Sequence, residues 1–293
     1  MAEFTDYVSS PFVLRALIAL FFVAVNAAFS GAFAAFRNST FLVTGASHAA
    51  LGGAALVILL QAHGALLGLQ PLVGGAVFAI VLALLAGNAS SRGSERNVDT
   101  AIGVGFAMAM ALAVLFMSLV PESASRVWGL VMGDLLLVTT DELWLLGGMT
   151  TVVVAMFGVF RRQFLFITFD LEGARAFGVR ADVYNYLLYG LIGLSSAILV
   201  KGIGAILVFA MLSAPAAAAM LVSRSVGQVM WLAFACAFGA GIAGITVSFF
   251  TGFSVSALAA FFAAATYFAI RTYAWLRTRV GSNGAGTVEN TNP

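Results

Sequence analysis

The sequence predicts an all-α, polytopic integral membrane protein with about eight or nine transmembrane helices. Of its 293 residues, 62% are hydrophobic and 9% are charged, whereas a soluble domain carries about 25% charged residues. The apolar residues form long runs, many close to the roughly 20 residues that a spanning helix needs. These runs lack the strict alternation of a membrane β-barrel. A water-soluble enzyme and a nucleic-acid-binding protein are therefore excluded.

Short polar breaks separate the apolar runs. The expected spans are 12–36, 41–61, 71–89, 100–120, 142–160, 183–200, 203–222, 229–250 and 253–276. The N-terminal residues include Glu3 and Asp6 instead of the cationic start of a signal peptide, so we expect the first run to be retained. Segment 128–141 is too short and polar to cross alone, and as an interfacial or re-entrant piece it leaves eight or nine spans open.

The cations predict the orientation, because Lys and Arg stay on the cytoplasmic side. With nine alternating spans, 11 of the 14 cations share one side. They are Arg37, Arg92, Arg96, Arg161, Arg162, Arg175, Arg180, Arg224, Arg271, Arg277 and Arg279. Arg15, Arg126 and Lys201 fall on the other side. The C-terminus is then cytoplasmic and the N-terminus outside, and with eight spans the N-terminal end would flip.

The domain organisation follows from the remaining polar segments. We expect a transmembrane domain over 1–280, with a cytoplasmic loop at about 161–182 that contains four Arg, two Asp and one Glu. That loop is either a solvated connection or an interaction surface. The polar tail 281–293 is expected to be disordered. The 31 glycines suit close helix packing, as in Gly64-x-x-x-Gly68.

Several catalytic motifs are absent from the sequence. The only lysine, Lys201, is not preceded by a Walker A glycine loop, so the chain does not hydrolyse ATP by a P-loop mechanism. No HExxH or GxSxG occurs, and we expect neither enzymatic activity nor a resident cofactor. The single Cys236 excludes an intrachain disulfide and a Cys-based zinc site.

The two histidines are the first candidates for a transition-metal ligand. His48 lies inside the second run and His63 at its outer end, 15 residues later, so they are roughly 22 Å apart along one helix. They cannot bind one ion within a chain. An ionisable group at membrane depth favours a function for His48, while a bond from its ring to a neighbouring backbone carbonyl is the structural alternative. His63 is expected at the interface.

Three carboxylates fall on the predicted outer side: Asp134, Asp141 and Glu142. They either attract a cation towards an entrance or are ordinary interfacial charges. No span contains a cluster of carboxylates, which argues against a secondary transporter that couples protons or sodium.

Five segments in order resemble the membrane permease subunit of ATP-binding-cassette (ABC) importers for zinc, manganese and ferrous iron. The matching segments are 36–56, 99–121, 127–143, 169–179 and 201–223. The strongest is the D-x-E-x-A-x-x-x-G run formed by Asp170, Glu172, Ala174 and Gly178. One departure is SFFTGFSVSA (248–257), which has Gly252, Ser254 and Ser256 where relatives often have Asp, Pro and Gly.

The resemblance implies a type II ABC importer-like permease in the cell membrane, surrounded by lipid. It implies a second permease copy or homologue, ATPase subunits that bind ATP in the cytoplasm, and an extracytoplasmic metal-binding protein. The run Asp170–Gly178 would dock on the ATPase. His48 would face the pore, with Thr44 and Ser47 as pore-lining hydroxyls.

The leading hypothesis is therefore import of a divalent transition metal ion, driven by a separate ATPase. Two alternatives remain at this point: a permease for a metal chelate, and a structural or assembly subunit without its own pore.

Overall fold

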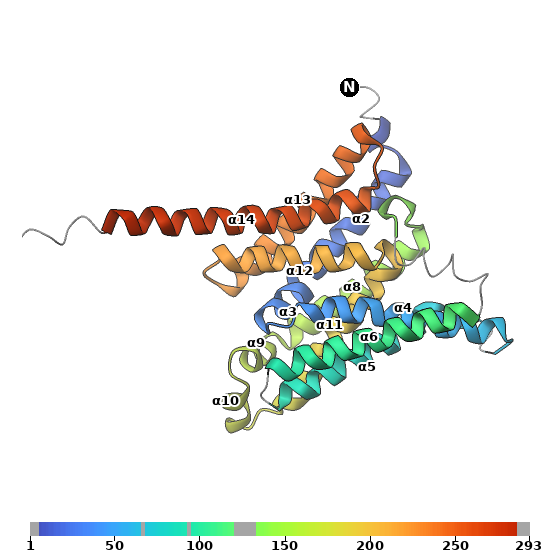
Figure 1. Ribbon diagram of the computed structural model, residues 1–293, viewed down its shortest axis with the longest axis horizontal. Coiled ribbons are helices and arrows are strands. Elements are labelled where there is room, and N and C mark those ends of the chain that lie inside the picture. The colour runs from blue at the N-terminus through green and yellow to red at the C-terminus, as the bar shows by residue number, and fades with distance from the viewer. Residues whose placement is uncertain (1–5, 66–67, 93–94, 120–132, 286–293) are drawn as a thin grey trace, which may run out of the picture.

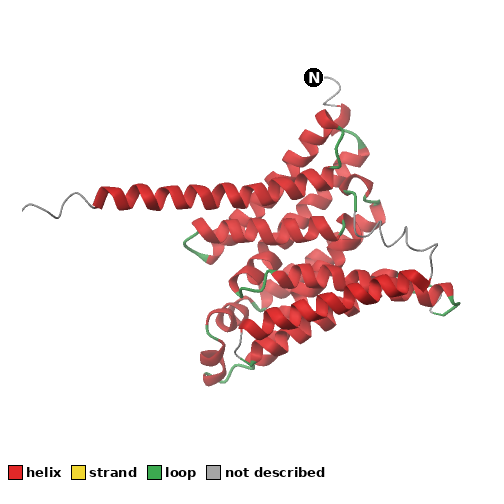
Figure 2. Cartoon of the chain, viewed as in Figure 1, coloured by secondary structure: helices red, strands yellow, loops and turns green. Residues whose placement is uncertain are grey.

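The structure is a computed structural model that describes residues 6–65, 68–92, 95–119 and 133–285. Figure 2 shows that the secondary structure of these residues is entirely helical. The elements are α2 (Pro11–Asn26), the π-helix η1 (Ala27–Gly31), α3 (Ala32–Phe36), α4 (Phe41–Ala62), α5 (Pro71–Ser91), α6 (Glu95–Leu119), the 3-10 helix η3 (Leu135–Leu137), α8 (Thr140–Val159), α9 (Arg161–Phe169), α10 (Leu171–Ala176), α11 (Ala181–Ile203), α12 (Ala205–Val222), α13 (Val226–Thr251) and α14 (Val255–Ala285).

Nine helices in the described ranges are long and apolar enough to cross a membrane, which confirms the higher expected count. The first span combines α2, η1 and α3, and each of the others is one helix. A helix satisfies its own backbone hydrogen bonds, as the bilayer interior requires. The chain is a multi-pass membrane protein.

Local sequence signals begin and end these helices. Ser10 caps α2 by accepting a hydrogen bond from the Val13 N–H, and Pro11 occupies the first turn, where its missing N–H costs nothing. Thr139 and Glu142 form a reciprocal capping box at the start of α8. Gly252 ends α13 in the left-handed conformation, with φ +70°.

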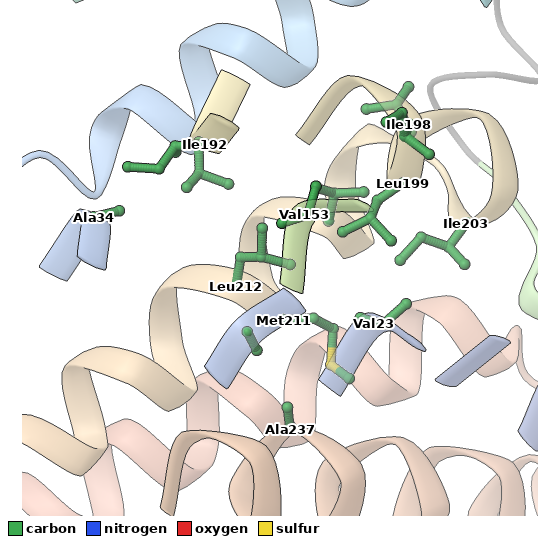
Figure 3. Close-up of a cluster of buried hydrophobic side chains, with 14 of the residues drawn as sticks. Val23, Ala34, Val153, Ile192, Ile198, Leu199, Ile203, Met211, Leu212 and Ala237 are labelled. Atoms are coloured by element: carbon green, nitrogen blue, oxygen red, sulfur yellow. The ribbon is translucent and has the colours of Figure 1, made fainter. Parts of the chain in front are cut away.

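Helices α4 and α11 form the centre of the bundle. In their hydrophobic windows 78% and 72% of the residues are buried, against 22% for α6, α8 and α14. Figure 1 shows α5 and α6 on one side of this centre and α12, α13 and α14 on the other. The close-up in Figure 3 shows side chains from α2, α3, α8, α11, α12 and α13 meeting in one buried cluster.

Glycine allows two helices to meet backbone to backbone at the crossing of α4 and α5. A Cβ on Gly53 would lie 2.0 Å from the Gly74 carbonyl oxygen, so a side chain would force the helices apart. The interpretation of Gly64 and Gly68 as a packing pair is wrong. Both follow the end of α4 with positive φ, and a Cβ on either would meet nothing within 4 Å, because they form the turn towards α5.

The connections place the polar segments at the two ends of the bundle. In Figure 1 the short helix α10 and the C-terminal end of α14 lie at the same end, which the positive-inside rule makes cytoplasmic. Of segment 128–141, residues 133–141 form η3 and the start of α8, and the rest lies outside the described residues, as does Arg126. Helix α14 includes residues 281–285 of the expected tail, and 286–293 are not described.

Candidate functional site

His48 is held on α4 by a backbone carbonyl one turn earlier. Its Nδ1 lies 2.9 Å from the Thr44 carbonyl oxygen. Because a carbonyl can only accept a hydrogen bond, the neutral ring carries its proton on Nδ1 and leaves the Nε2 lone pair available. None of the described residues makes a hydrogen bond to Nε2. The carbonyl bond expected as the structural alternative is present.

The Thr44 hydroxyl shares this face of the helix, four residues before His48. Its oxygen is buried and has no hydrogen-bond partner among the described residues. The Phe106 ring of α6 packs edge-on against His48 at 5.0 Å between centroids. Thr44 and His48 therefore form a small polar pair beside an aromatic ring.

Ser47 differs from these two residues. It is fully buried, and its hydroxyl donates to the Val43 carbonyl at 2.7 Å. His63 caps the far end of α4 in an exposed position. The described ranges contain no group of three or more His, Cys, Asp or Glu side chains that could hold a metal ion. Within this part of the chain, His48 with Thr44 offers weak ligation only.

The second predicted site is the cytoplasmic helix α10. Asp170 caps its start, where Oδ1 accepts a hydrogen bond from the Gly173 N–H at 2.7 Å. Ala174 is fully buried and anchors the helix, while Glu172 is exposed. Gly178 follows the helix end with φ +78°, a backbone conformation that favours glycine.

Exposed aromatic side chains surround α10. Phe177 is 81% exposed and Phe169 66% exposed, at the end of the molecule where charge is otherwise concentrated. Two large exposed aromatic side chains that flank one short helix make it a candidate for a protein–protein contact. Arg175 stabilises the loop by pairing with Asp182 at 2.5 Å and donating to the Ser91 carbonyl.

The three outer carboxylates have local structural roles or exposed positions. Asp134 caps η3 through a hydrogen bond from the Leu136 N–H, and Glu142 accepts one from the Thr139 N–H. Asp141 is exposed in the first turn of α8. All three lie near the beginning of one span, so they add negative charge to the outer end.

The sequence matches a protein-family model over most of its length. The model of the ABC 3 transport family matches residues 9–274. The chain belongs to the ABC 3 transport family.

Relatives of this ABC 3 permease include two curated bacterial proteins. The chain is 30% identical over 242 residues to the manganese import system permease protein ScaB of Streptococcus gordonii, covering 81% of this chain and 82% of ScaB. It is 29% identical over 222 residues to the manganese transport system membrane protein MntC of Listeria innocua, covering 76% of each.

The fold of the ABC 3 permease also matches a solved structure. It superimposes on a chain of PsaBC from Streptococcus pneumoniae in complex with Fab, with a TM-score of 0.78 and 27% sequence identity. The match covers 92% of this chain and 94% of that chain. The type II ABC importer-like fold expected from the sequence is therefore confirmed.

A polar cluster around Arg37 was missed by sequence reasoning, which counted this residue only as a cytoplasmic cation. Its guanidinium donates to the Ile167 carbonyl at 2.8 Å, and to Ser90 Oγ and Asn185 Oδ1 at 2.6 Å each. It also lies over the Tyr189 ring at 5.7 Å. Arg37 thus connects the end of the first span to α5, α9 and α11 of the ABC 3 permease.

A second polar cluster lies within the bundle. Asn26 is 2% exposed; its amide nitrogen donates to Thr150 Oγ1, and its oxygen accepts from Ser195 Oγ. An asparagine inside the first apolar run was the available sequence signal, because buried polar groups need partners. The cluster joins α2, α8 and α11.

Proposed function

We propose that this ABC 3 permease imports a divalent transition metal ion into the cytoplasm, with Mn²⁺ as the first candidate and Zn²⁺ or Fe²⁺ as competitors. The proposal rests on one observation: the Nε2 lone pair of His48 is left available, about one helical turn from the unpaired Thr44 hydroxyl. Imidazole nitrogen suits these metals. The names of the two curated relatives favour manganese.

On its way through the membrane, the metal ion binds only weakly at His48 and Thr44. One imidazole and one neutral oxygen in each chain can replace part of the hydration shell of the ion without trapping it, and a conducting path needs this balance. A second permease copy, related by a two-fold axis, supplies the same pair again. Asp134, Asp141 and Glu142 raise the local concentration of cations at the outer end.

The energy comes from a partner. A separate ATPase subunit binds ATP in the cytoplasm and docks on α10, through Glu172, Phe177 and the turn at Gly178. The permease itself carries out no chemical step and holds no resident cofactor. An extracytoplasmic metal-binding protein delivers the ion to the outer end.

Uptake into vesicles tests this function. The permease, its ATPase subunit and the extracytoplasmic metal-binding protein are reconstituted together, and entry of radiolabelled Mn²⁺, Zn²⁺ and Fe²⁺ is measured with and without ATP. We expect saturable, ATP-dependent Mn²⁺ entry, and a loss of at least about tenfold in His48→Ala, because a lost metal ligand costs more than 1.4 kcal/mol in the barrier.

His63→Ala is the matched control, because this histidine sits on the same helix with the same type of carbonyl contact. It should transport normally. Unchanged entry of all three metals in His48→Ala would contradict the role of His48. Entry of a metal chelate in place of the bare ions would exclude the proposed substrate, and absence of any transport would leave a structural subunit as the answer.

A further inference from the structure

An apolar cavity of about 530 Å³ opens between the first span, the junction of α8 and α9, and the start of α13. Its walls include Phe33, Phe157, Met230 and Phe234. Arg161 is the only charged residue in the lining. The volume lies in the range of about 300–1,000 Å³ typical of small-molecule sites. None of the proposed transport residues lies in it.

The cavity extends along α13 by nearly the thickness of one leaflet. On α13 the lining residues run from Val226 to Phe234, which corresponds to about 12 Å along the helix axis. Half of a bilayer hydrocarbon core is about 15 Å. Since Arg161 and Val226 begin their helices at the cytoplasmic end, the cavity lies beside the inner leaflet.

The cytoplasmic mouth of the cavity is positively charged, because Arg161 and the start of α13 both lie there. No described residue makes an ion pair with Arg161, because the one salt bridge in this part of the chain joins Arg175 and Asp182. The first turn of α13 also lines the mouth through Val226 and Gly227, so the positive end of the helix dipole adds to the field. An anionic group is favoured there.

We propose that this cavity binds an anionic phospholipid of the inner leaflet, with an acyl chain between α2, α8 and α13 and the phosphate on Arg161. A basic pocket between membrane helices on the cytoplasmic side is a recognised setting for anionic headgroups. The transported cation does not fit, because the walls offer it no ligand and Arg161 repels it.

Trp231 provides a local probe, because it lines the cavity and is 68% exposed. The other three of the four tryptophans, Trp128, Trp144 and Trp275, are changed to Phe. The full chain is reconstituted into vesicles of phosphatidylcholine that contain increasing mole fractions of brominated phosphatidylglycerol or brominated phosphatidylcholine. Bromine quenches the tryptophan only where it makes contact.

We expect brominated phosphatidylglycerol to reach half-maximal quenching at about fivefold lower mole fraction than brominated phosphatidylcholine, as one arginine near an anionic group predicts. Arg161→Gln should abolish this preference. Arg162→Gln removes the same charge from the adjacent position, which does not line the cavity, and should keep it. An unchanged emission maximum of Trp231 and helical circular dichroism show that each variant is folded.

Three results would overturn the proposal. Equal quenching by the two brominated lipids would show that the cavity has no preference for an anion. An equal loss of preference in Arg162→Gln would reduce the effect to general surface charge. Absence of quenching by either lipid would mean that protein covers the cavity. None of these outcomes depends on metal transport, so they leave the proposed function unaffected.

Discussion

At the scale of a single residue, the Thr44 carbonyl decides which ring nitrogen of His48 keeps its lone pair. A hydrogen bond at Nδ1 fixes both the tautomer and the direction of the ring. Arg37 shows the same principle for a cation. Three neutral oxygens and an aromatic face surround its guanidinium, so the planar fork of donors is satisfied without a carboxylate.

Arg37→Lys tests this arrangement. Lysine keeps the charge, but its single ammonium group cannot reach oxygens on three elements in the geometry of a guanidinium. We expect the free energy of unfolding to fall by about 2–3 kcal/mol, since hydrogen bonds to charged groups are worth about 1.5–3 kcal/mol each. Thermal unfolding in detergent, followed by circular dichroism, measures the change. Arg92→Lys, at an exposed helix end, is the control; equal midpoints for both variants would argue against the cluster.

Helix α10 illustrates how an element of six residues is made stable. A helix this short does not form alone in water, so the Asp170 cap, the buried Ala174 and the left-handed Gly178 hold it in place. A Cβ on Gly173 would lie 2.0 Å from an Asp170 carboxylate oxygen, so a larger residue at this position would displace the carboxylate from its capping position. The anchored helix leaves Phe177 outside.

Phe177→Ser should weaken association with the ATPase subunit at least about tenfold, because a buried aromatic side chain at the centre of an interface contributes more than 1.4 kcal/mol. Pull-down of the ATPase by the permease in detergent measures this loss. The fold should be unaffected, since Phe177 is 81% exposed. Trp144→Ser is the matched control, because Trp144 is 79% exposed on α8.

The double variant Glu172→Arg with Gly178→Trp extends this test to the charge and the turn of the same surface. This double variant should abolish association. Retained binding in both variants would mean that the ATPase docks elsewhere.

At the scale of the whole molecule, an odd number of spans puts the two ends of the transmembrane domain on opposite sides. The nine spans of the described chain and the arginines at one end together make that end cytoplasmic. Helices α4 and α11 lie inside the bundle, while α6, α8 and α14 keep most of their surface for lipid or for other chains.

Cysteine labelling tests this orientation. In a Cys236→Ser background, His63→Cys should react with a membrane-impermeant maleimide in intact cells. Ser225→Cys should react only after the membrane is opened, because the two exposed positions lie at opposite ends of spans. The reverse pattern would invert the topology. Labelling of both from outside would contradict the span count.

The apolar runs predicted the positions of the described spans within a few residues, because the bilayer imposes a similar length on every crossing helix, although the sequence left a count of eight or nine open. The sequence also pointed to His48 and to the helix at Asp170. It did not reveal the cluster of Arg37 with Asn185, since contacts between residues 148 positions apart leave no local pattern. The prediction that Gly64 and Gly68 pack two helices together failed for a related reason, because spacing alone does not distinguish a helix crossing from a turn.

The long separations around Arg37 have a consequence for how the protein is made. Ile167 and Asn185 follow Arg37 by 130 and 148 residues, so at a synthesis rate of about 5–20 residues per second they emerge roughly 7–30 s later. Until then the guanidinium must stay hydrated at the cytoplasmic surface, where its charge helps to orient the first span. Arg37 can join its partners only once α11 has begun to emerge, after five of the nine described spans, so its hydrogen bonds form midway through assembly and before the last three spans are made.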